Sequence, residues 1–250
     1  MNVTVAICTW NRAELLRQTL AEIAKMRIPA GARWEVLVVD NNSTDATPSV
    51  VASFEGRLPA RRVFEPRPGK SHALNRAARE ARGDYILWTD DDALVAEDWL
   101  VEYGEAFRRW PDAAVFGGAV EPWFAAEPPA WLRRAWPRVA HAYAARDPGP
   151  ETRPIEPHFA PFGVNLAVRA SEQRRFLYDP ALGPRPNSAL RGEETSLVRA
   201  MLEAGVRGWW VPTARVRHYI PAERLTIGYL RGFFFGQGQF WGLTMERPPA

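Results

Sequence analysis

The stretch DYILWTDDD (Asp84–Asp92) joins a run of apolar residues to three consecutive aspartates. A short apolar run of this kind is typical of a strand that is buried on both faces of a parallel sheet. Ligands of open α/β sheets bind outside the carboxyl ends of the strands, where the three carboxylates fall. Because adjacent carboxylates repel one another, we expect a divalent cation there, and carboxylate oxygens favour Mg²⁺ or Mn²⁺. The alternative is capping of a helix that begins near Glu97, but a cap accounts for one aspartate and not for three.

Strand and helix patterns alternate along the first part of the chain. Apolar runs predict strands, and apolar residues at helical spacing predict helices between them. The predicted strands cover residues 3–8, 34–39, 61–64 and 85–89, and the predicted helices cover 13–26, 47–54 and 71–81. This βαβ alternation predicts an α/β fold with a doubly wound, mostly parallel central sheet that is flanked by helices.

The regular alternation stops after residue 121. Residues 122–162 are rich in proline and tryptophan, and a long irregular insertion of this kind is commonly a lid or a binding loop. Further helices are predicted at 131–145, 193–204 and 224–243, and further strands at 163–168 and 209–216. We expect a single domain over residues 1–250, with two halves that meet at the start of the insertion.

Composition narrows the class of protein. A net charge of +3 over 250 residues argues against a dedicated nucleic-acid binder. No apolar run reaches the length of a membrane span, and the first residues look like a strand rather than a signal peptide. Cys8 is the only cysteine, which excludes an internal disulfide. These features favour a cytoplasmic protein. Lysine is rare beside arginine in this chain, which makes Lys70 conspicuous.

Polar residues follow each of the first four predicted strands. They are TWNR (9–12), DNNSTD (40–45), PGKSH (68–72) and the three aspartates (90–92). Each cluster alone is explained by turn or capping chemistry. Because the carboxyl ends of neighbouring parallel strands meet at one edge of a sheet, the four clusters together predict a shared ligand site.

Six stretches resemble the motifs of family 2 glycosyltransferases, which have the GT-A fold. They are AICTWNR (6–12), VVDNNSTD (38–45), GKSHALN (69–75), LWTDDD (87–92), FGVN (162–165) and GEE (192–194). Together they extend over nearly the whole chain. The resemblance implies a nucleotide-sugar-binding half at residues 1–121. It also implies an acceptor-binding half at 122–250, which carries the Pro/Trp-rich loop and a C-terminal helix.

The resemblance implies which residues bind the donor, a nucleotide-diphosphate sugar of the UDP, GDP or dTDP type. The implied donor-binding residues are Thr9, Asn11, Arg12, Asp40, Asn42, Lys70, Asn75, Asp90 and Asp91. Asp90 and Asp92 match the D-x-D signature, which implies a bound Mn²⁺ or Mg²⁺ with Asp92 as its direct ligand and Asp90 as a partner of the ribose or of the metal. His218 lies where a histidine completes the metal site in related enzymes. The alternative for His218 is a strand-end histidine that is bonded to the backbone.

The GEE stretch resembles the Glu-Asp motif of the family, in which the second acid is the usual general base. Glu194 is therefore the expected base, and Glu193 is the alternative. Either residue also suits the first turn of a helix, where the helix dipole favours carboxylates.

The activity implied by the resemblance is a metal-dependent, inverting and non-processive hexosyl transfer. The implied acceptor is a glycan, a lipid-linked or a small-molecule hydroxyl compound in bacterial polysaccharide or glycoconjugate biosynthesis. The Gln-x-x-Arg-Trp motif of processive synthases is absent, which favours transfer of single sugars. The alternatives are retaining transfer on the same fold and an inactive nucleotide- or carbohydrate-binding module. A sugar nucleotidylyltransferase is disfavoured because TWNR has no glycine.

Aromatic residues offer further contacts. We expect one or two tryptophans to contact the acceptor, from the set Trp123, Trp131, Trp136, Trp209 and Trp210. The aromatic segment 229–241 is expected to pack on the domain. The alternative is contact with a membrane surface, which places the protein peripherally at the inner face of the membrane.

Overall fold

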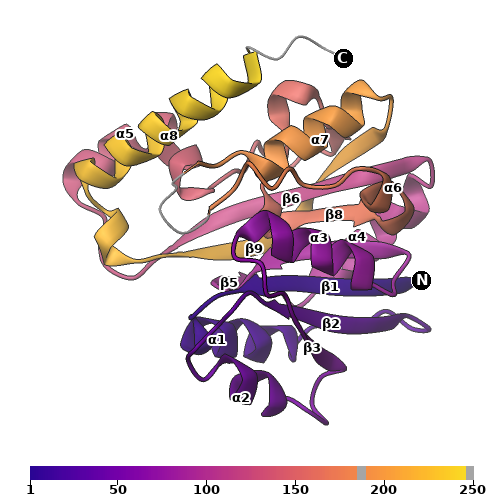
Figure 1. The fold of residues 1–250 in the computed structure, drawn as a ribbon. Helices are drawn as coiled ribbons and strands as arrows, with labels where there is room; N and C mark the ends of the chain where they lie inside the picture. The colour runs from indigo at the N-terminus through magenta and orange to yellow at the C-terminus, as the bar shows by residue number, and fades with distance from the viewer. Residues whose placement is uncertain (185–189, 246–250) are drawn as a thin grey trace.

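The computed structural model describes residues 1–184 and 190–245, which form an α/β fold around a central sheet (Figure 1). The strands are β1 (Asn2–Thr9), β2 (Arg33–Asp40), β3 (Ala60–Phe64), β4 (Tyr85–Asp90), β5 (Ala93–Val95), β6 (Ala113–Phe124), β7 (Arg153–Pro154), β8 (Leu166–Arg169) and β9 (Arg207–Ile220). The helices are α1 (Ala13–Ile23), α2 (Thr47–Ala52), α3 (Lys70–Glu80), α4 (Trp99–Arg109), α5 (Ala130–Val139), α6 (Ala170–Arg175), α7 (Glu193–Glu203) and α8 (Ile227–Met245). The predicted α/β class is confirmed.

The strands are ordered β3-β2-β1-β4-β8-β6-β9-β5 across the sheet, with β7 beside β9. The first four strands in this order are parallel to one another. Strand β8 runs antiparallel between β4 and β6, so β6 has the direction of β4, and β9 is parallel to β6. Among the described strands only β5, β7 and β8 run the other way, so the sheet is mostly parallel, as predicted.

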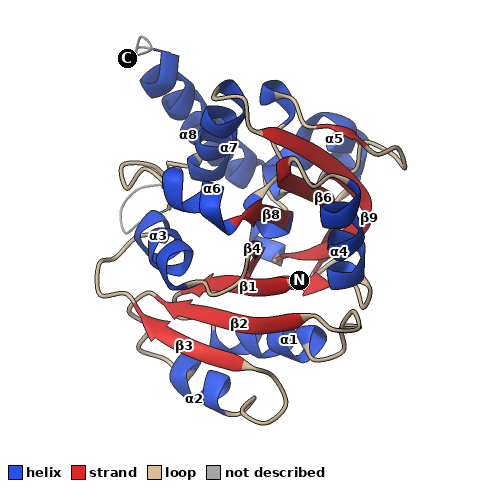
Figure 2. Cartoon of the chain, turned by 90° about the vertical axis from the view of Figure 1, so that its right-hand side faces the viewer, coloured by secondary structure: helices blue, strands red, loops and turns tan. Residues whose placement is uncertain are grey.

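Helices cover both faces of the sheet. Along β1, Val3, Val5 and Ile7 join the core under α1, α2 and α4, whereas Ala6 joins the core under α3, α6 and α7. Successive side chains of a strand point to opposite faces, which explains why an apolar run with no alternation marked this strand. Figure 2 shows α3 and α4 on opposite sides of the sheet.

The carboxyl ends of β1, β2 and β4 lie side by side. Thr9 at the end of β1 is paired with Asp40 of β2, and Cys8 is paired with Asp90 of β4. The polar clusters that follow these strands therefore begin at one edge of the sheet, where a doubly wound fold binds its ligand.

The insertion is more regular than its composition predicts. Strand β6 extends to Phe124 because its last residues pair with β9. The helix predicted at 131–145 is split into α5 and a 3-10 turn at Ala140–Tyr143. Pro137 lies near the end of α5, where its missing N–H weakens the helical ladder. Helix α6 has no predicted counterpart.

The C-terminal helix α8 packs beside α5 at one end of the molecule (Figure 1). Tyr229 and Phe233 of α8 join a small core with Leu132 of α5 and Ile220 of β9. This inner face of α8 packs on the domain, as expected, whereas Phe235 on its outer side is 70% exposed. No helix in the described part of the chain is long and apolar enough to cross a membrane.

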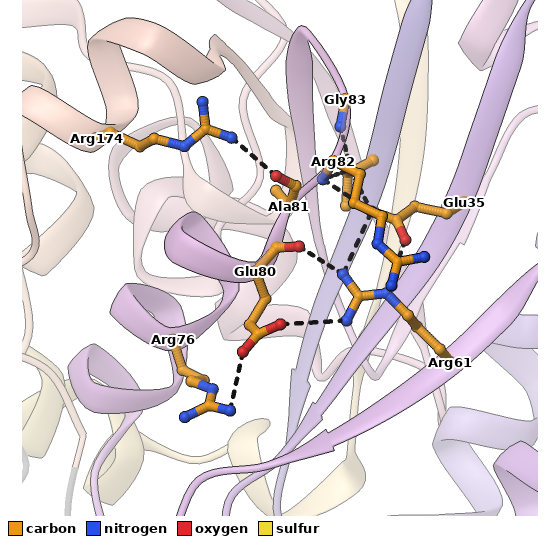
Figure 3. A network of polar contacts seen from close by, with 9 residues as sticks. Glu35, Arg61, Arg76, Glu80, Ala81, Arg82, Gly83 and Arg174 are labelled. Atoms are coloured by element: carbon orange, nitrogen blue, oxygen red, sulfur yellow. Dashed lines mark hydrogen bonds and ion pairs between the residues drawn. The ribbon is translucent and has the colours of Figure 1, made fainter.

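A polar network joins the amino-terminal parts of β1–β3 to the end of α3 (Figure 3). It therefore lies at the opposite end of the strands from their carboxyl ends. Glu35 accepts hydrogen bonds from the Thr4 hydroxyl, Arg61 Nε and the Arg82 backbone N–H, at 2.8, 2.8 and 3.0 Å. Arg61 also donates to the backbone oxygen of Glu80 at the end of α3. The network fixes α3 against the strands, and α3 begins at Lys70 on the ligand side.

Candidate active site

A cavity of about 1260 Å³ opens at the carboxyl ends of β1, β2 and β4. One wall consists of residues that follow these strands, among them 8–10, 41–42, 68–70 and 90–92. The other wall consists of residues 141–144 and 157–158 of the insertion, the start of α7 and the inner side of α8. The insertion and the C-terminal helix therefore enclose the same space as the strand-end clusters.

The side chain of Asp91, the middle aspartate, points into the protein interior. Asp91 accepts hydrogen bonds from the Thr9 hydroxyl at 2.7 Å and from Arg12 at 3.0 Å, and it is 4% exposed. Burial and the neighbouring charge of Asp92 raise the pKa of Asp91 to about 7, although Arg12 and Thr9 act against this rise. Arg12 also donates to Asp92 at 2.8 Å, so one guanidinium holds two of the three carboxylates.

Asp90, Asp92 and His218 form a group whose ligand atoms all lie within 4.8 Å of one another. The Nδ1 atom of His218 is 3.0 Å from the backbone oxygen of Tyr143, which places the proton on Nδ1 of the neutral ring. Nε2 faces Asp92, whose Oδ1 is 3.4 Å away. Burial lowers the pKa of His218, but the bond to Asp92 and the charge of Asp92 outweigh burial and raise it, so Nε2 carries a proton unless a cation takes its place. His218 therefore bonds the backbone with one nitrogen and faces the aspartates with the other, and its role in metal binding remains a prediction.

The chemistry of this group fits a divalent cation. The Oδ1 atom of Asp92 is buried and accepts no hydrogen bond from the described residues, which is costly unless a cation or water occupies the space beside it. Burial opposes ionisation of Asp92, but the neighbouring His218 and Arg12 outweigh it and hold the pKa of Asp92 below its ordinary range. Two carboxylates and an imidazole with a bonded Nδ1–H are a donor set typical of metal sites.

Lys70 lies between this group and the start of α7. Its Nζ is 2.7 Å from Glu194 and 3.5 Å from both Glu193 and Asp90. Burial lowers the pKa of Lys70, but the three carboxylates outweigh burial, so the pKa is raised well above its ordinary value. The ammonium therefore stays charged and balances the carboxylates around it.

The two glutamates have different environments although they are neighbours in the sequence. The Glu194 side chain is 17% exposed, and the charge of Lys70 outweighs burial and lowers its pKa. The Glu193 side chain is 3% exposed, and burial together with the charge of Glu194 raises its pKa to about 8. At neutral pH Glu194 is therefore the ionised member of the pair and the one that is more open to the cavity.

Glycines make room for both carboxylates. A Cβ atom at Gly163 would lie 2.5 Å from Oε1 of Glu194, and one at Gly183 would lie 3.1 Å from Cδ of Glu193. Gly192 precedes α7 with φ +104°, a conformation that favours glycine, and so turns the chain into the helix. The glycines in FGVN and GEE therefore have a steric role that the sequence alone did not assign.

Three expected donor-binding residues are absent from the described cavity wall, namely Asn11, Asp40 and Asn75. Asp40 is 1% exposed, and its oxygens accept bonds from Arg62 at 2.8 Å and from the Ser43 backbone at 2.9 Å. Asn75 exchanges two 2.8 Å hydrogen bonds with the backbone of Tyr178. These contacts support the loops around the site, and the donor-binding role of these residues remains a prediction.

The loops after β1 and β2 are held together by asparagines with positive φ. Asn11 has φ +51°, and its side-chain oxygen accepts a bond from the Thr44 backbone at 2.7 Å. Asn42 has φ +70°, and its amide donates to the backbone oxygens of Glu65 and Pro66. Asparagine tolerates this conformation better than most residues, which accounts for its use in these turns.

Several cavity residues were not predicted from the sequence. The tryptophans that line it are Trp10 and Trp241, and none of the five expected to contact the acceptor is in its described wall. Trp10 lies inside the predicted TWNR cluster and is 54% exposed. A large apolar residue in a polar loop could therefore have been predicted from the sequence as a ligand contact. Arg146, Arg191 and Arg224 also line the cavity, but arginine is too frequent in this chain to mark them.

A mostly parallel sheet that brings a candidate metal group and a carboxylate pair to one cavity at its strand ends defines the GT-A class of glycosyltransferases. The family model for glycosyl transferase family 2 matches residues 4–167, and the chain therefore belongs to this family. The predicted family 2 membership and GT-A fold are confirmed.

Relatives cover the chain to different extents. The succinoglycan biosynthesis protein ExoM of Rhizobium meliloti is 28% identical over 97% of this chain and 74% of its own length. The glycosyltransferase YfnE of Bacillus subtilis is 32% identical over 47% of this chain but only 30% of its own length.

Solved structures show the same fold. The mannosyltransferase PcManGT of Pyrobaculum calidifontis, solved with GDP-Man and Mn²⁺, is 25% identical with a TM-score of 0.70. The similarity covers 99% of this chain and 65% of PcManGT, so the chain spans slightly less than two thirds of that protein. S. aureus TarS, at 17% identity and a TM-score of 0.64, shows the fold alone.

Proposed function

We propose that this chain transfers a sugar from a nucleotide-diphosphate sugar to an acceptor hydroxyl, with inversion at the anomeric carbon. One observation carries the proposal. The candidate metal group of Asp90, Asp92 and His218 and the ionised carboxylate of Glu194 face one cavity, with Lys70 between them. A leaving-group site and a base that share a cavity are what direct displacement at carbon requires.

Asp90, Asp92 and His218 are the residues that would hold the metal. An imidazole beside two carboxylates favours Mn²⁺ over Mg²⁺, which takes oxygen ligands almost exclusively. When bound, a divalent cation neutralises the charge that develops on the departing diphosphate. PcManGT contains Mn²⁺, which supports the same cofactor here.

The donor is proposed to lie along the strand-end wall. Thr9 and Arg12 hold Asp91 and Asp92 in position, while Asn42 lines the cavity and Asn11 supports the adjoining turn. The exposed ring of Trp10 is available to stack on a nucleobase. UDP, GDP and dTDP sugars are the candidate donors, and PcManGT binds GDP-Man.

Glu194 is proposed as the general base that takes the proton from the acceptor hydroxyl. It is the ionised and more exposed member of the glutamate pair, whereas Glu193 is buried. Lys70 stabilises the ionised form of Glu194 and also reaches Asp90, so it is placed to contact the donor. A single base facing the donor site supports inverting transfer. Non-processive transfer is proposed because the sequence lacks the Gln-x-x-Arg-Trp motif.

The outer side of α8 is proposed to contact a membrane surface peripherally. Ile227 and Phe235 are 61% and 70% exposed, and the helix contains no acidic residue. Apolar side chains together with the basic α5 suit the interface of an anionic membrane. A beta-monoglucosyldiacylglycerol synthase of Nostoc is 30% identical over 45% of this chain, and its name indicates a lipid product.

Two measurements test the proposed activity. Thermal shift with UDP, GDP and dTDP, each with and without Mn²⁺, should show stabilisation by one nucleotide that depends on the metal. Proton NMR of the product made from the matching sugar nucleotide should show the anomeric configuration opposite to that of the donor. Retention of configuration would overturn the inverting assignment, and stabilisation that is independent of Mn²⁺ would overturn the metal assignment.

A further inference from the structure

Arg146 is a largely buried cation on the insertion side of the cavity. Its guanidinium lies 4.2 Å from the ring centre of Phe162 and 4.7 Å from that of Phe159, and one N–H donates to the backbone oxygen of Ala160. In the described part of the chain no carboxylate lies within ion-pair distance of it. Burial lowers the pKa of Arg146 to about 10, so the site holds a charged group at a cost in desolvation.

Two other cations of the cavity do have carboxylate partners. Arg12 and Lys70 are paired with the carboxylates described above. Arg191 is stacked over Phe233 of α8 and, like Arg146, has no ion-pair partner among the described carboxylates, whereas the charge of Arg224 acts on Asp92 and helps to lower its pKa. The wall formed by the insertion, the start of α7 and α8 therefore carries Arg146 and Arg191 without a local counter-charge, whereas its two carboxylates, Glu193 and Glu194, are paired with Lys70.

From this geometry we infer that the acceptor carries a phosphate group, and that Arg146, with Arg191 on the same wall, binds it. The inference rests on the proposed transferase activity. Guanidinium groups match phosphate oxygens with paired, charge-assisted hydrogen bonds, and stacking on aromatic rings holds them in the required plane. A neutral sugar acceptor would leave these cations without a counter-charge.

The location distinguishes this group from the diphosphate of the donor. Arg146 stacks on Phe162, and the next residue, Gly163, lies against Glu194, the proposed base. The phosphate would therefore lie on the acceptor side of the base, and the donor diphosphate would lie at Asp90 and Asp92. The aromatic side chains of α8 line the same wall and give an apolar surface beside the cations.

The phosphate could belong to a soluble sugar phosphate or to a phospholipid-linked acceptor, and three probes separate these sources. They are glycerol 3-phosphate, octyl phosphate and octyl glucoside, which carry a phosphate, a phosphate with a tail, and a tail without phosphate. Calorimetric titration into protein saturated with Mn²⁺ and its nucleoside diphosphate should show binding of both phosphates and none of octyl glucoside. Tighter binding of octyl phosphate assigns a lipid-linked acceptor, and equal binding assigns a soluble one.

Variants locate the site. Arg146→Met keeps an unbranched apolar side chain in place of the arginine stem and removes the guanidinium, and it should weaken binding of octyl phosphate at least about tenfold, with nucleotide affinity unchanged. Arg191→Met should weaken it as well, because Arg191 lines the same cavity. Arg153→Met is the matched control, because Arg153 also stacks on Phe159, at 4.5 Å, but is not in the described cavity wall. This control should bind the probe with wild-type affinity.

Three outcomes would overturn the inference. One is equal affinity for octyl phosphate in wild type and Arg146→Met, provided that the melting temperature shows the variant to be folded. Another is a loss of nucleotide affinity in Arg146→Met by the same factor, which would assign Arg146 to the donor. The third is no binding of either phosphate by wild-type protein that binds nucleotide. Protein that binds octyl phosphate but no nucleotide would contradict the proposed function while supporting the anion site.

Discussion

The substitution Gly163→Ala tests the proposed base without touching its chemistry. The added Cβ would lie 2.5 Å from Oε1 and 2.6 Å from Cγ of Glu194, whereas ordinary contacts begin at 3.4 Å. The carboxylate therefore has to move by about 1 Å. A displacement of this size at a reacting group can reduce turnover by about 10²-fold, so kcat should fall by that order.

The assay measures kcat from the release of nucleoside diphosphate at saturating donor and acceptor, alongside calorimetric affinity for the nucleotide. Glu194→Gln should lower kcat by about 10²–10⁴-fold, because it keeps the size and removes the base. The double variant should be no slower than Glu194→Gln, since both changes act on one carboxylate. Nucleotide affinity should stay at the wild-type value in all of them, because the donor is held by the other wall.

A matched control separates the steric effect from the loss of a glycine. Gly232 in α8 has open space around the position of a Cβ, so Gly232→Ala should retain wild-type turnover. Wild-type turnover in Gly163→Ala would refute the reasoning about Glu194. So would a double variant whose losses multiply, because the two residues would then act independently.

Two further substitutions and one exchange measurement have defined outcomes. Asp92→Asn should weaken Mn²⁺-dependent nucleotide binding at least about tenfold by calorimetry, and unchanged affinity would remove Asp92 from the metal site. Amides of residues 147–160 should exchange faster than those of β4 in the free protein and slow with donor and acceptor, whereas equal protection of both segments would contradict a mobile insertion. Glu35→Gln should cost about 1–3 kcal/mol of unfolding free energy at pH 7, measured by urea denaturation, because Glu35 holds the network of Figure 3. Burial raises the pKa of Glu35, but its hydrogen bonds outweigh burial and lower the pKa below the ordinary 4.5, so the difference from wild type should shrink only as the pH falls below that value.

The strand-end clusters were predictable because they depend on local order in the chain. A buried strand followed by polar residues places those residues at one sheet edge whatever the rest of the fold does. DYILWTDDD and VVDNNSTD therefore located the cavity correctly, and the helical spacing after GEE located α7. The direction of β8 was not predictable, because its pairing with β4 and β6 depends on contacts far apart in the sequence.

The sequence also could not predict which polar residues line the cavity and which support the loops around it. Asp40 and Asn75 match motifs, yet their side chains bond to Arg62 and to the Tyr178 backbone, and only the tertiary structure shows these partners. The same holds for Arg146, whose lack of a carboxylate partner among the described residues depends on how the insertion folds over the sheet. Because the chain is so rich in arginine, its composition could not single out Arg146 as a candidate site residue.

The central claim is that Asp90, Asp92 and His218 hold Mn²⁺ together with the diphosphate of the donor. Pulsed electron paramagnetic resonance of the protein with Mn²⁺ and its nucleoside diphosphate tests this most directly. One spectrum should show phosphorus hyperfine coupling from the diphosphate and nitrogen coupling from the imidazole, and the nitrogen coupling should be lost in His218→Gln. A Mn²⁺ signal that shows neither coupling, or a nitrogen coupling that survives in His218→Gln, would contradict it.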